Sequence, residues 1–196
     1  MLQPELELKI TDAPGPAISA AERWSIAIHE AGHAVVCVYY EIPFTRLYIQ
    51  PNGNGGVMLD REKERLLQSP PRVRYASKLI VSGYAGIVGH RKINPSVPFA
   101  GAKYDHDHVS GLLWYDFKYE RIFDKTTGSF RSPTEAEVEV IVNRRARRLW
   151  RITRRLVHKL YPVIVAVARV LIERKRMTGD EVVAIAGPLI AANATQ

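Results

Sequence analysis

The chain has 196 residues, 46% of them hydrophobic and 24% charged, which is typical of a single folded domain and excludes disordered and collagen-like chains. The balance of 28 basic and 20 acidic residues gives a net charge of +8, which permits an acidic partner without requiring one. A single cysteine, Cys37, excludes an intramolecular disulfide and fits a reducing compartment.

Helix caps, hydrophobic spacing and helix breakers predict a mainly α-helical fold. Ser19-Ala-Ala-Glu22 has the spacing of a capping box, in which the Ser and Glu side chains bind backbone N–H groups, so a helix is expected to begin there. Pro43 would stop this helix. We expect helices, in chain order, at residues 19–40, 70–94, 104–119 and 132–161, with a short last helix at 178–187.

The only sheet predicted is a small β-ribbon. Residues 45–50 alternate in polarity, residues 57–59 form a second short run, and Asn52-Gly-Asn-Gly-Gly56 between them is typical of a turn. A further turn is expected at residues 126–129. The ribbon could hold an extended substrate by strand addition, and a plain hairpin is the simpler interpretation.

Other caps and breakers set the ends of the predicted domain. Ser132-Pro-Thr-Glu135 is a second capping box at the start of a long amphipathic helix, which Pro162 would kink or end. Thr178-Gly-Asp-Glu181 would cap the short last helix, and Gly187-Pro188 would end it. We therefore expect an N-terminal arm at 1–18, one domain at 19–187 and a C-terminal tail at 188–196.

The first predicted helix contains His29-Glu30-Ala-Gly-His33. Histidines four residues apart lie on one face of a helix, so both can bind one metal ion, and the glutamate beside them can act on a metal-activated water. A chain of this composition would contain such a match by chance with a probability of about 0.01. The pattern predicts a zinc site with His29 and His33 as ligands and Glu30 as catalytic base; two incidental surface histidines are the alternative.

A catalytic zinc ion usually has three protein ligands and one open position. Candidates for the third ligand follow one another at the start of the third predicted helix: Asp105, His106, Asp107 and His108. Their spacing does not choose among them, and a solvated helix start is the alternative interpretation. We expect Cys37, four residues after His33, to be a small buried residue and not a ligand.

Several segments resemble the FtsH-like AAA zinc metalloprotease family. His29-Glu-Ala-Gly-His-Ala34 resembles the zinc helix of that family, and Tyr48-Ile-Gln-Pro51 resembles the strand segment that follows it. Residues 101–105, Gly-Ala-Lys-Tyr-Asp, are similar to the family's Thr-Gly-Ala-Ser-Asn-Asp segment, whose Asp is the third zinc ligand. Residues 171–182 resemble the end of the family's peptidase domain, so the similarity covers about residues 20–185.

The resemblance implies a helical zinc-metallopeptidase (HExxH) domain in which Asp105 joins His29 and His33 as a ligand of Zn2+. Glu30 would take a proton from the attacking water and deliver it to the leaving amine. The implied activity is that of a zinc-dependent endopeptidase, whose partner is a polypeptide substrate that is unfolded or flexible.

The chain departs from the family in two places. It contains no Gly-x-x-x-x-Gly-Lys-Ser/Thr nucleotide loop, which leaves open whether a separate AAA ATPase acts as its partner. Where the family's second helix usually carries Gly-Arg-x-Ala-Glu, this chain has Gly83-Tyr-Ala-Gly-Ile87, with an apolar residue in place of the acidic one. Residues that surround a metal site orient the side chains that bind the metal. The loss of the acidic residue therefore favours, as the alternative to an active peptidase, a module that is catalytically weak or inactive.

Eight of the 28 basic residues lie between Arg144 and Lys159, where they recur at helical spacing. Such a stripe can bind phosphates or carboxylates. The alternative function is therefore a peptidase-like module that binds an acidic partner (nucleic acid, anionic lipid or protein) through the basic helix at residues 144–159. A solvated helix face is the simpler interpretation of the same residues.

The sequence carries no recognisable targeting signal. Its amino-terminal residues lack the basic start and apolar run of a secretory signal. No window holds the roughly 18 apolar residues that a membrane helix needs. We therefore expect no transmembrane segment and a cytoplasmic location.

Overall fold

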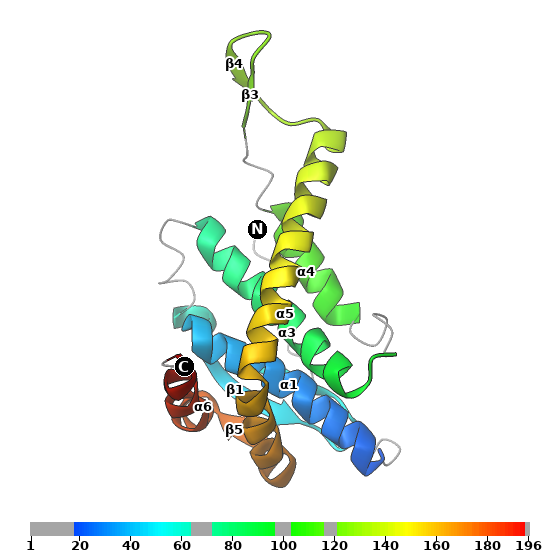
Figure 1. The fold of residues 1–196 in the computed structure, drawn as a ribbon, viewed down its shortest axis with the longest axis vertical. Helices are drawn as coiled ribbons and strands as arrows, with labels where there is room; N and C mark the ends of the chain where they lie inside the picture. The colour runs from blue at the N-terminus through cyan, green and yellow to red at the C-terminus, as the bar shows by residue number, and fades with distance from the viewer. Residues whose placement is uncertain (1–17, 64–71, 97–102, 116–120, 195–196) are drawn as a thin grey trace.

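The computed structural model describes residues 18–63, 72–96, 103–115 and 121–194, and its fold is mainly helical, as predicted. Residues 1–17 of the arm predicted at 1–18 lie outside the described residues, as do Pro70, Pro71, Gly101 and Ala102. The elements in chain order (Figure 1) are α1 (Ala20–Tyr40), β1 (Phe44–Ile49), β2 (Gly55–Leu59), α3 (Arg72–Ile93), α4 (Lys103–Tyr115), β3 (Ile122–Asp124), β4 (Ser129–Arg131), α5 (Glu135–Arg174), β5 (Arg176–Thr178) and α6 (Gly179–Ala194).

The capping box expected at the start of α1 is present. The Glu22 N–H donates to Ser19 Oγ at 3.2 Å, and the Ser19 N–H donates to Glu22 Oε2 at 2.8 Å. The helix ends where Glu41 adopts a left-handed conformation, two residues before Pro43. Because α1 packs against both α3 and α5, its middle lies in the core, with buried residues at 27–28 and 30–37.

The predicted β-ribbon exists, but it belongs to a larger sheet. β1 lies in the centre of an antiparallel sheet of order β2-β1-β5, in which Leu47 of β1 is paired with Val57 on one side and Met177 on the other. The expectation of a single ribbon was wrong because β5 is only three residues long, too short for a recognisable alternation. A second ribbon, β3 and β4, flanks the predicted turn at residues 126–129, where Gly128 has a φ of 65°.

The long helix begins two residues later than expected. Thr134 is its N-cap, and Thr134 and Glu137 form the capping box that the sequence analysis had placed at Ser132 and Glu135. Both pairs have the required spacing, and Glu137 has a second partner, because Arg131 donates to both of its carboxylate oxygens at 2.7 and 2.8 Å. The ion pair between Arg131 and Glu137 explains why the helix begins after Thr134 and not after Ser132.

The helix end predicted at Gly187-Pro188 was wrong, and at Pro162, where the sequence left a kink or an end open, the helix does not end. α5 continues through Pro162 to Arg174, and α6 continues through Gly187 and Pro188 to Ala194, so most of the predicted tail is helical. Packing explains both continuations. Val163 and Ile164 are fully or almost fully buried directly after Pro162, and Ile190 packs against the core beyond Pro188. The cap predicted at Thr178 and Glu181 is present, with N–H to side-chain oxygen distances of 2.7 and 3.2 Å.

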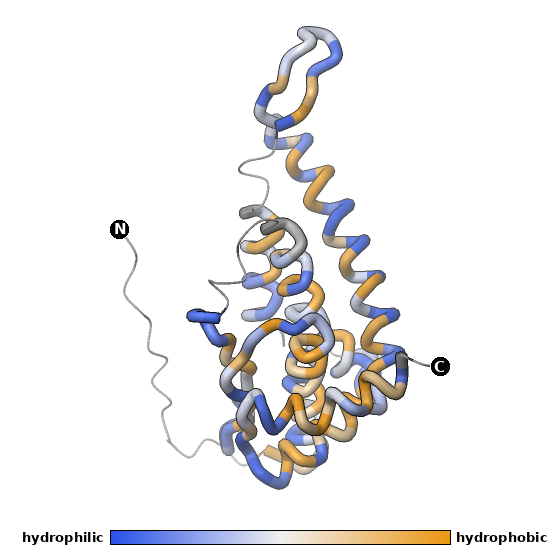
Figure 2. The backbone as a smooth tube through the Cα atoms, turned by 90° about the vertical axis from the view of Figure 1, so that its left-hand side faces the viewer, coloured by the Kyte–Doolittle hydropathy of each residue, from blue (hydrophilic) through white to orange (hydrophobic). Residues whose placement is uncertain are grey.

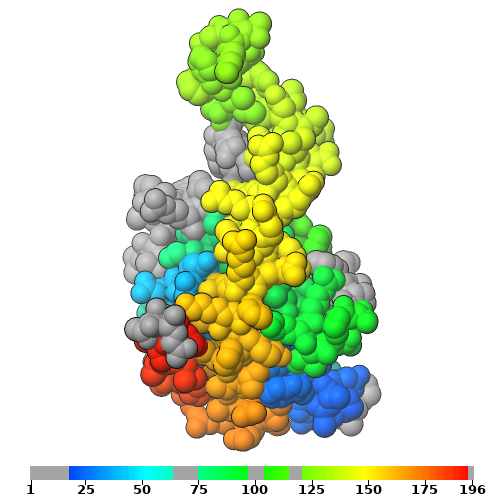
Figure 3. Space-filling view, in the orientation of Figure 1, coloured from blue at the N-terminus to red at the C-terminus, as the bar shows by residue number. Residues whose placement is uncertain are grey.

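The core lies where α1, α3 and α5 meet above the sheet. Figure 2 shows hydrophobic and hydrophilic residues alternating along α5, as expected of an amphipathic helix. The first part of α5 and the β3–β4 hairpin stand out from the rest of the surface (Figure 3). Among the described residues, no helix is long and apolar enough to cross a membrane.

Candidate metal centre

The three residues predicted to bind zinc meet at one point. His29 and His33 lie one turn apart on α1, with their Nε2 atoms 3.0 Å from each other. Asp105 lies in the first turn of α4, and its Oδ2 is 2.8 Å from His29 Nε2 and 3.4 Å from His33 Nε2. The three side chains form a group that could hold a metal ion.

The spacing of these atoms fits a tetrahedral metal ion. Zinc ligands at 2.0–2.1 Å from the ion stand about 3.3 Å apart at the corners of a tetrahedron, close to the three distances found here. Two imidazole nitrogens and one carboxylate oxygen leave a fourth corner open, as catalytic zinc sites do. The same donor set also suits other divalent ions that bind imidazole, so the geometry does not identify the metal.

The pKa values of the ligands show how strongly they interact. Burial lowers the pKa of His33, but Asp105, Glu30 and the Ser82 carbonyl together outweigh burial and raise it to about 9. Burial likewise raises the pKa of Asp105, but His33 and His29 outweigh it and hold this pKa well below its usual range. A proton and a divalent cation therefore compete for the same atoms.

A backbone carbonyl orients one of the ligands. His33 Nδ1 donates to the Ser82 main-chain oxygen at 2.7 Å, which leaves the Nε2 lone pair facing Asp105 and His29. The Ser82 hydroxyl is also within 3.2 Å of Cys37 Sγ. Cys37 is buried, as predicted, and burial raises the pKa of its thiol to about 12.

Two glycines allow α1 and α3 to approach each other closely at the site. A methyl group on Gly32 would lie 2.9 Å from the Ala85 main-chain oxygen. A methyl group on Gly86 would collide with His33 Nε2 itself. These two glycines therefore let the backbone of α3 lie against the face of α1 that carries His29 and His33.

Glu30 is buried beside the histidines, with 8% of its surface exposed. Burial raises the pKa of its carboxyl group, while the neighbouring His29 and His33 lower it and burial prevails. The side chain lies against β2, because a methyl group on Gly55 would be 2.7 Å from Glu30 Cγ. The carboxylate is thus held between the metal-binding histidines and the sheet.

The remaining candidates lie elsewhere. His106, Asp107 and His108 are exposed on α4, so of the four possible third ligands it is Asp105 that reaches the two histidines. Ile87, which replaces the family's acidic residue, is part of the core. A charged side chain at position 87 would be buried and would need a partner of opposite charge or a hydrogen-bond donor. In this structure the contact from α3 to His33 is made by the Ser82 main-chain carbonyl.

Sequence reasoning missed several neighbours of the site. Ser82, Gly86 and Gly55 contact the predicted residues, and the His90 ring lies edge-on to His29 with its centroid 6.0 Å away. The spacing of Gly83, Gly86 and His90 along one helix was a usable signal, because residues three and four apart share a face. The role of the Ser82 carbonyl could not be predicted from the sequence, because every residue has a main-chain carbonyl.

Comparisons with known proteins add no relative to this picture: no protein-family model matches the chain, and a search of curated proteins finds no match. The resemblance to FtsH-like peptidases therefore rests on the motifs quoted above.

Proposed function

We propose that this protein is a zinc-dependent endopeptidase that hydrolyses peptide bonds in unfolded or flexible polypeptides. The observation that carries the proposal is the meeting of His29, His33 and Asp105 at metal-ligand distances, with the Glu30 carboxyl buried beside them. A surface helix with incidental histidines would not bring a carboxylate from a distant segment onto both imidazoles.

Each side chain has a distinct task in this proposal. His29 Nε2, His33 Nε2 and Asp105 Oδ2 bind the ion, and the Ser82 carbonyl keeps His33 in the required tautomer. Bound there, zinc would supply Lewis acidity toward a water molecule and the scissile carbonyl. The Glu30 carboxylate accepts the proton of the attacking water and returns it to the leaving amine, a role that a raised pKa suits.

The sheet offers a place for the substrate. Among the described strands, β2 lies at an edge of the sheet, paired with β1 on one side, and its Gly55 lies against Glu30. An extended polypeptide could add to this edge and pass the catalytic carboxylate. Unfolding a stable domain costs about 5–15 kcal/mol, so flexible or unfolded chains are the substrates that can adopt this conformation without assistance.

The first test is the metal content of the purified protein. We expect about one zinc ion per chain. Because each ligand holds the ion directly, His29→Ala, His33→Ala and Asp105→Ala should each lose it. Asp107→Ala is the matched control, since Asp107 is an exposed carboxylate two residues away, and it should retain the metal. Protein without any transition metal, or equal zinc loss in both aspartate variants, would refute the site.

The second test separates metal binding from catalysis. Glu30→Gln should keep the zinc ion and slow hydrolysis of a casein-like substrate by about 10²- to 10⁴-fold, because it removes the base and no ligand. Full turnover in this variant would contradict the role of Glu30. A model protein should be cut faster in a permanently unfolded form than in its native form, and equal rates would contradict the proposed substrate class.

A further inference from the structure

A strongly basic surface runs along α5, on the side of α3 away from the metal centre. Between Arg144 and Lys159 the helix carries eight arginine or lysine residues and no acidic residue. These residues span about 22 Å of helix at 1.5 Å per residue, so there is a cation about every 3 Å. This density is far above that of an ordinary solvated face, where both signs of charge mix.

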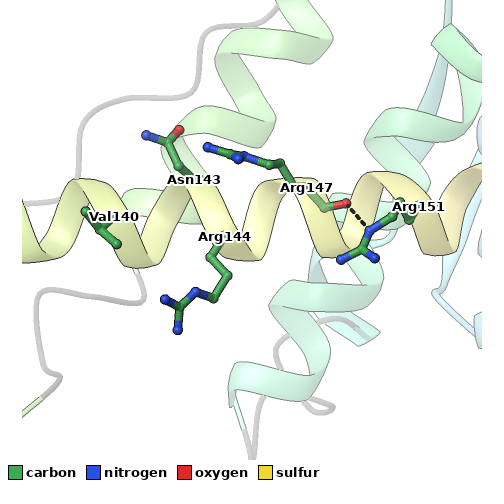
Figure 4. A pocket seen from close by; sticks show the side chains of 5 residues that line it. All are labelled: Val140, Asn143, Arg144, Arg147 and Arg151. Carbon is green, nitrogen blue, oxygen red and sulfur yellow. Dashed lines mark hydrogen bonds between the residues drawn. The ribbon is translucent and has the colours of Figure 1, made fainter.

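Seven of these eight basic residues are exposed, because the opposite face of α5 packs into the core, and the eighth, Arg145, is half-buried and donates to Ser77 Oγ at 3.1 Å. Leu149, Leu156 and Leu160 are buried, and α5 packs against α1 and α3. Arg144 and Arg147 extend from the helix, and Arg151 is folded back toward the Arg147 main-chain oxygen (Figure 4), to which its Nε donates at 3.4 Å. These arginines, with Val140 and Asn143, line a hollow of about 400 Å³.

The basic face continues into a groove between α5 and the end of α3. The groove has a volume of about 760 Å³. Six of its lining residues are basic, from both helices, and no acidic residue lines it: Arg91 and Lys92 of α3, and Arg151, Arg154, Arg155 and His158 of α5. Two segments about 60 residues apart in the sequence thus contribute to one positively charged cleft.

Contacts inside the groove fix the position of its lysine. Lys92 Nζ donates a hydrogen bond to His158 Nδ1 at 3.0 Å and lies 4.8 Å from the centre of the Tyr161 ring. Within the described part of the chain, Arg151, Arg154 and Arg155 make no salt bridge with a carboxylate. Their mutual repulsion is uncompensated by the fold, so a bound polyanion would relieve it.

We propose that this groove and the adjoining face of α5 bind the phosphate backbone of a nucleic acid duplex, without reading its base sequence. Arginine, which dominates the surface, presents a planar fork that matches phosphate oxygens. A duplex carries one charge per about 1.7 Å, dense enough to pair with every cation here.

Two other polyanions fit less well. A polypeptide rises about 3.3 Å per residue, so an acidic segment would need a carboxylate at nearly every position to match the stripe. An anionic membrane would meet a concave groove, and the apolar face of α5 is already buried in the core and cannot enter lipid.

The proposed site is independent of the metal centre. On α3, Ser82, Gly86 and His90 face α1, whereas Val88, Arg91 and Lys92 line the groove. These two sets lie on opposite sides of one helix. Nucleic acid binding should therefore survive in Glu30→Gln and His33→Ala, whatever their effect on hydrolysis.

The test is fluorescence anisotropy of labelled 20-base-pair duplexes of two unrelated sequences, titrated with the full chain at several salt concentrations. We expect equal affinity for both sequences and weaker binding as salt rises. The triple variant Arg151→Gln, Arg154→Gln, Arg155→Gln should lose at least about tenfold in affinity, and the salt slope should fall by about 0.9 per arginine that contacts a phosphate.

The matched control removes the same charge elsewhere. Lys63→Gln, Lys125→Gln and Arg176→Gln are three exposed changes outside the groove, and this variant should bind like the original protein. Thermal unfolding should confirm that both triple variants fold. Equal loss of affinity in both would overturn the proposal, as would absence of duplex binding at low salt. Preference for poly-glutamate or for phosphatidylserine vesicles over the duplex would overturn it in favour of those partners.

Discussion

Around the metal centre α1 and α3 lie so close that Gly32 has no room for a methyl group, whereas residues 135–148 of α5 contribute only Val142 to the buried core. Both regions are helical. They differ in their surroundings: α1 carries two of the three residues that could hold a metal ion and is packed in the core, whereas the first part of α5 carries charged side chains exposed to solvent. The comparison teaches that a helical sequence pattern predicts the element, while the packing partners decide its rigidity and its role.

The largest expected effect tests this difference within α5 itself. Leu160 is 1% exposed and Val140 is 58% exposed. Leu160→Ala should lower the free energy of unfolding by about 2–5 kcal/mol, because it leaves a cavity in the core. Val140→Ala should change it by less than about 0.5 kcal/mol, because most of the side chain is already exposed to solvent. Urea unfolding of both variants measures the contrast, and similar losses would mean that the outer part of α5 is packed after all.

A second prediction sharpens the comparison at the helix contact. Gly86→Ala places a methyl group on His33 Nε2, so it should destabilise the fold by about 1–3 kcal/mol and abolish zinc binding. Gly111→Ala in α4 is the control, because nothing lies within 4 Å of the added methyl group. Alanine loses less backbone entropy on folding than glycine does, so this variant should be more stable than the original protein by about 0.5–1 kcal/mol. Full zinc content in Gly86→Ala would show that the two helices separate easily.

The smallest expected effect concerns the junction between the β3–β4 hairpin and α5. Hydrogen bonds from Arg131, and next from Thr134, lower the pKa of Glu137 from its usual 4.5 to about 2. Because folding lowers this pKa, the Glu137 carboxylate stabilises the folded protein above pH 4.5, and its contribution is lost as the pH falls toward 2. Arg131→Gln should move the pKa of Glu137 upward toward 4.5 in an NMR titration of its carboxyl carbon. An unchanged titration would mean that Arg131 does not hold this exposed junction.

Local signals account for what the sequence analysis predicted well. The capping boxes at Ser19 and Thr178 and the one-turn spacing of His29 and His33 depend on residues three or four apart, and the structure contains each of them. Interactions of this range are decided by the chain near them.

Predictions that depended on distant packing were less complete. Asp105 could be chosen over its three neighbours only by family resemblance, because it meets His29 across 76 positions of the sequence. The extension of α6 past Pro188 depends on Ile190 reaching the core, and the Ser82 carbonyl that orients His33 has no sequence signature at all. In these places tertiary contacts override or supplement the local pattern.

The pairing of β5 with β1 joins residues about 130 positions apart, as Leu47 and Met177 show. Contacts between residues so far apart in the sequence form late in folding, because closing the long loop between them costs chain entropy before the contact stabilises the fold. During synthesis, β1 and β2 would leave the ribosome before α3, α4 and α5 are made, so they would be present for some time without β5, the third strand of the sheet. The centre of the sheet should therefore be among the last parts of the molecule to become protected from hydrogen exchange in refolding experiments.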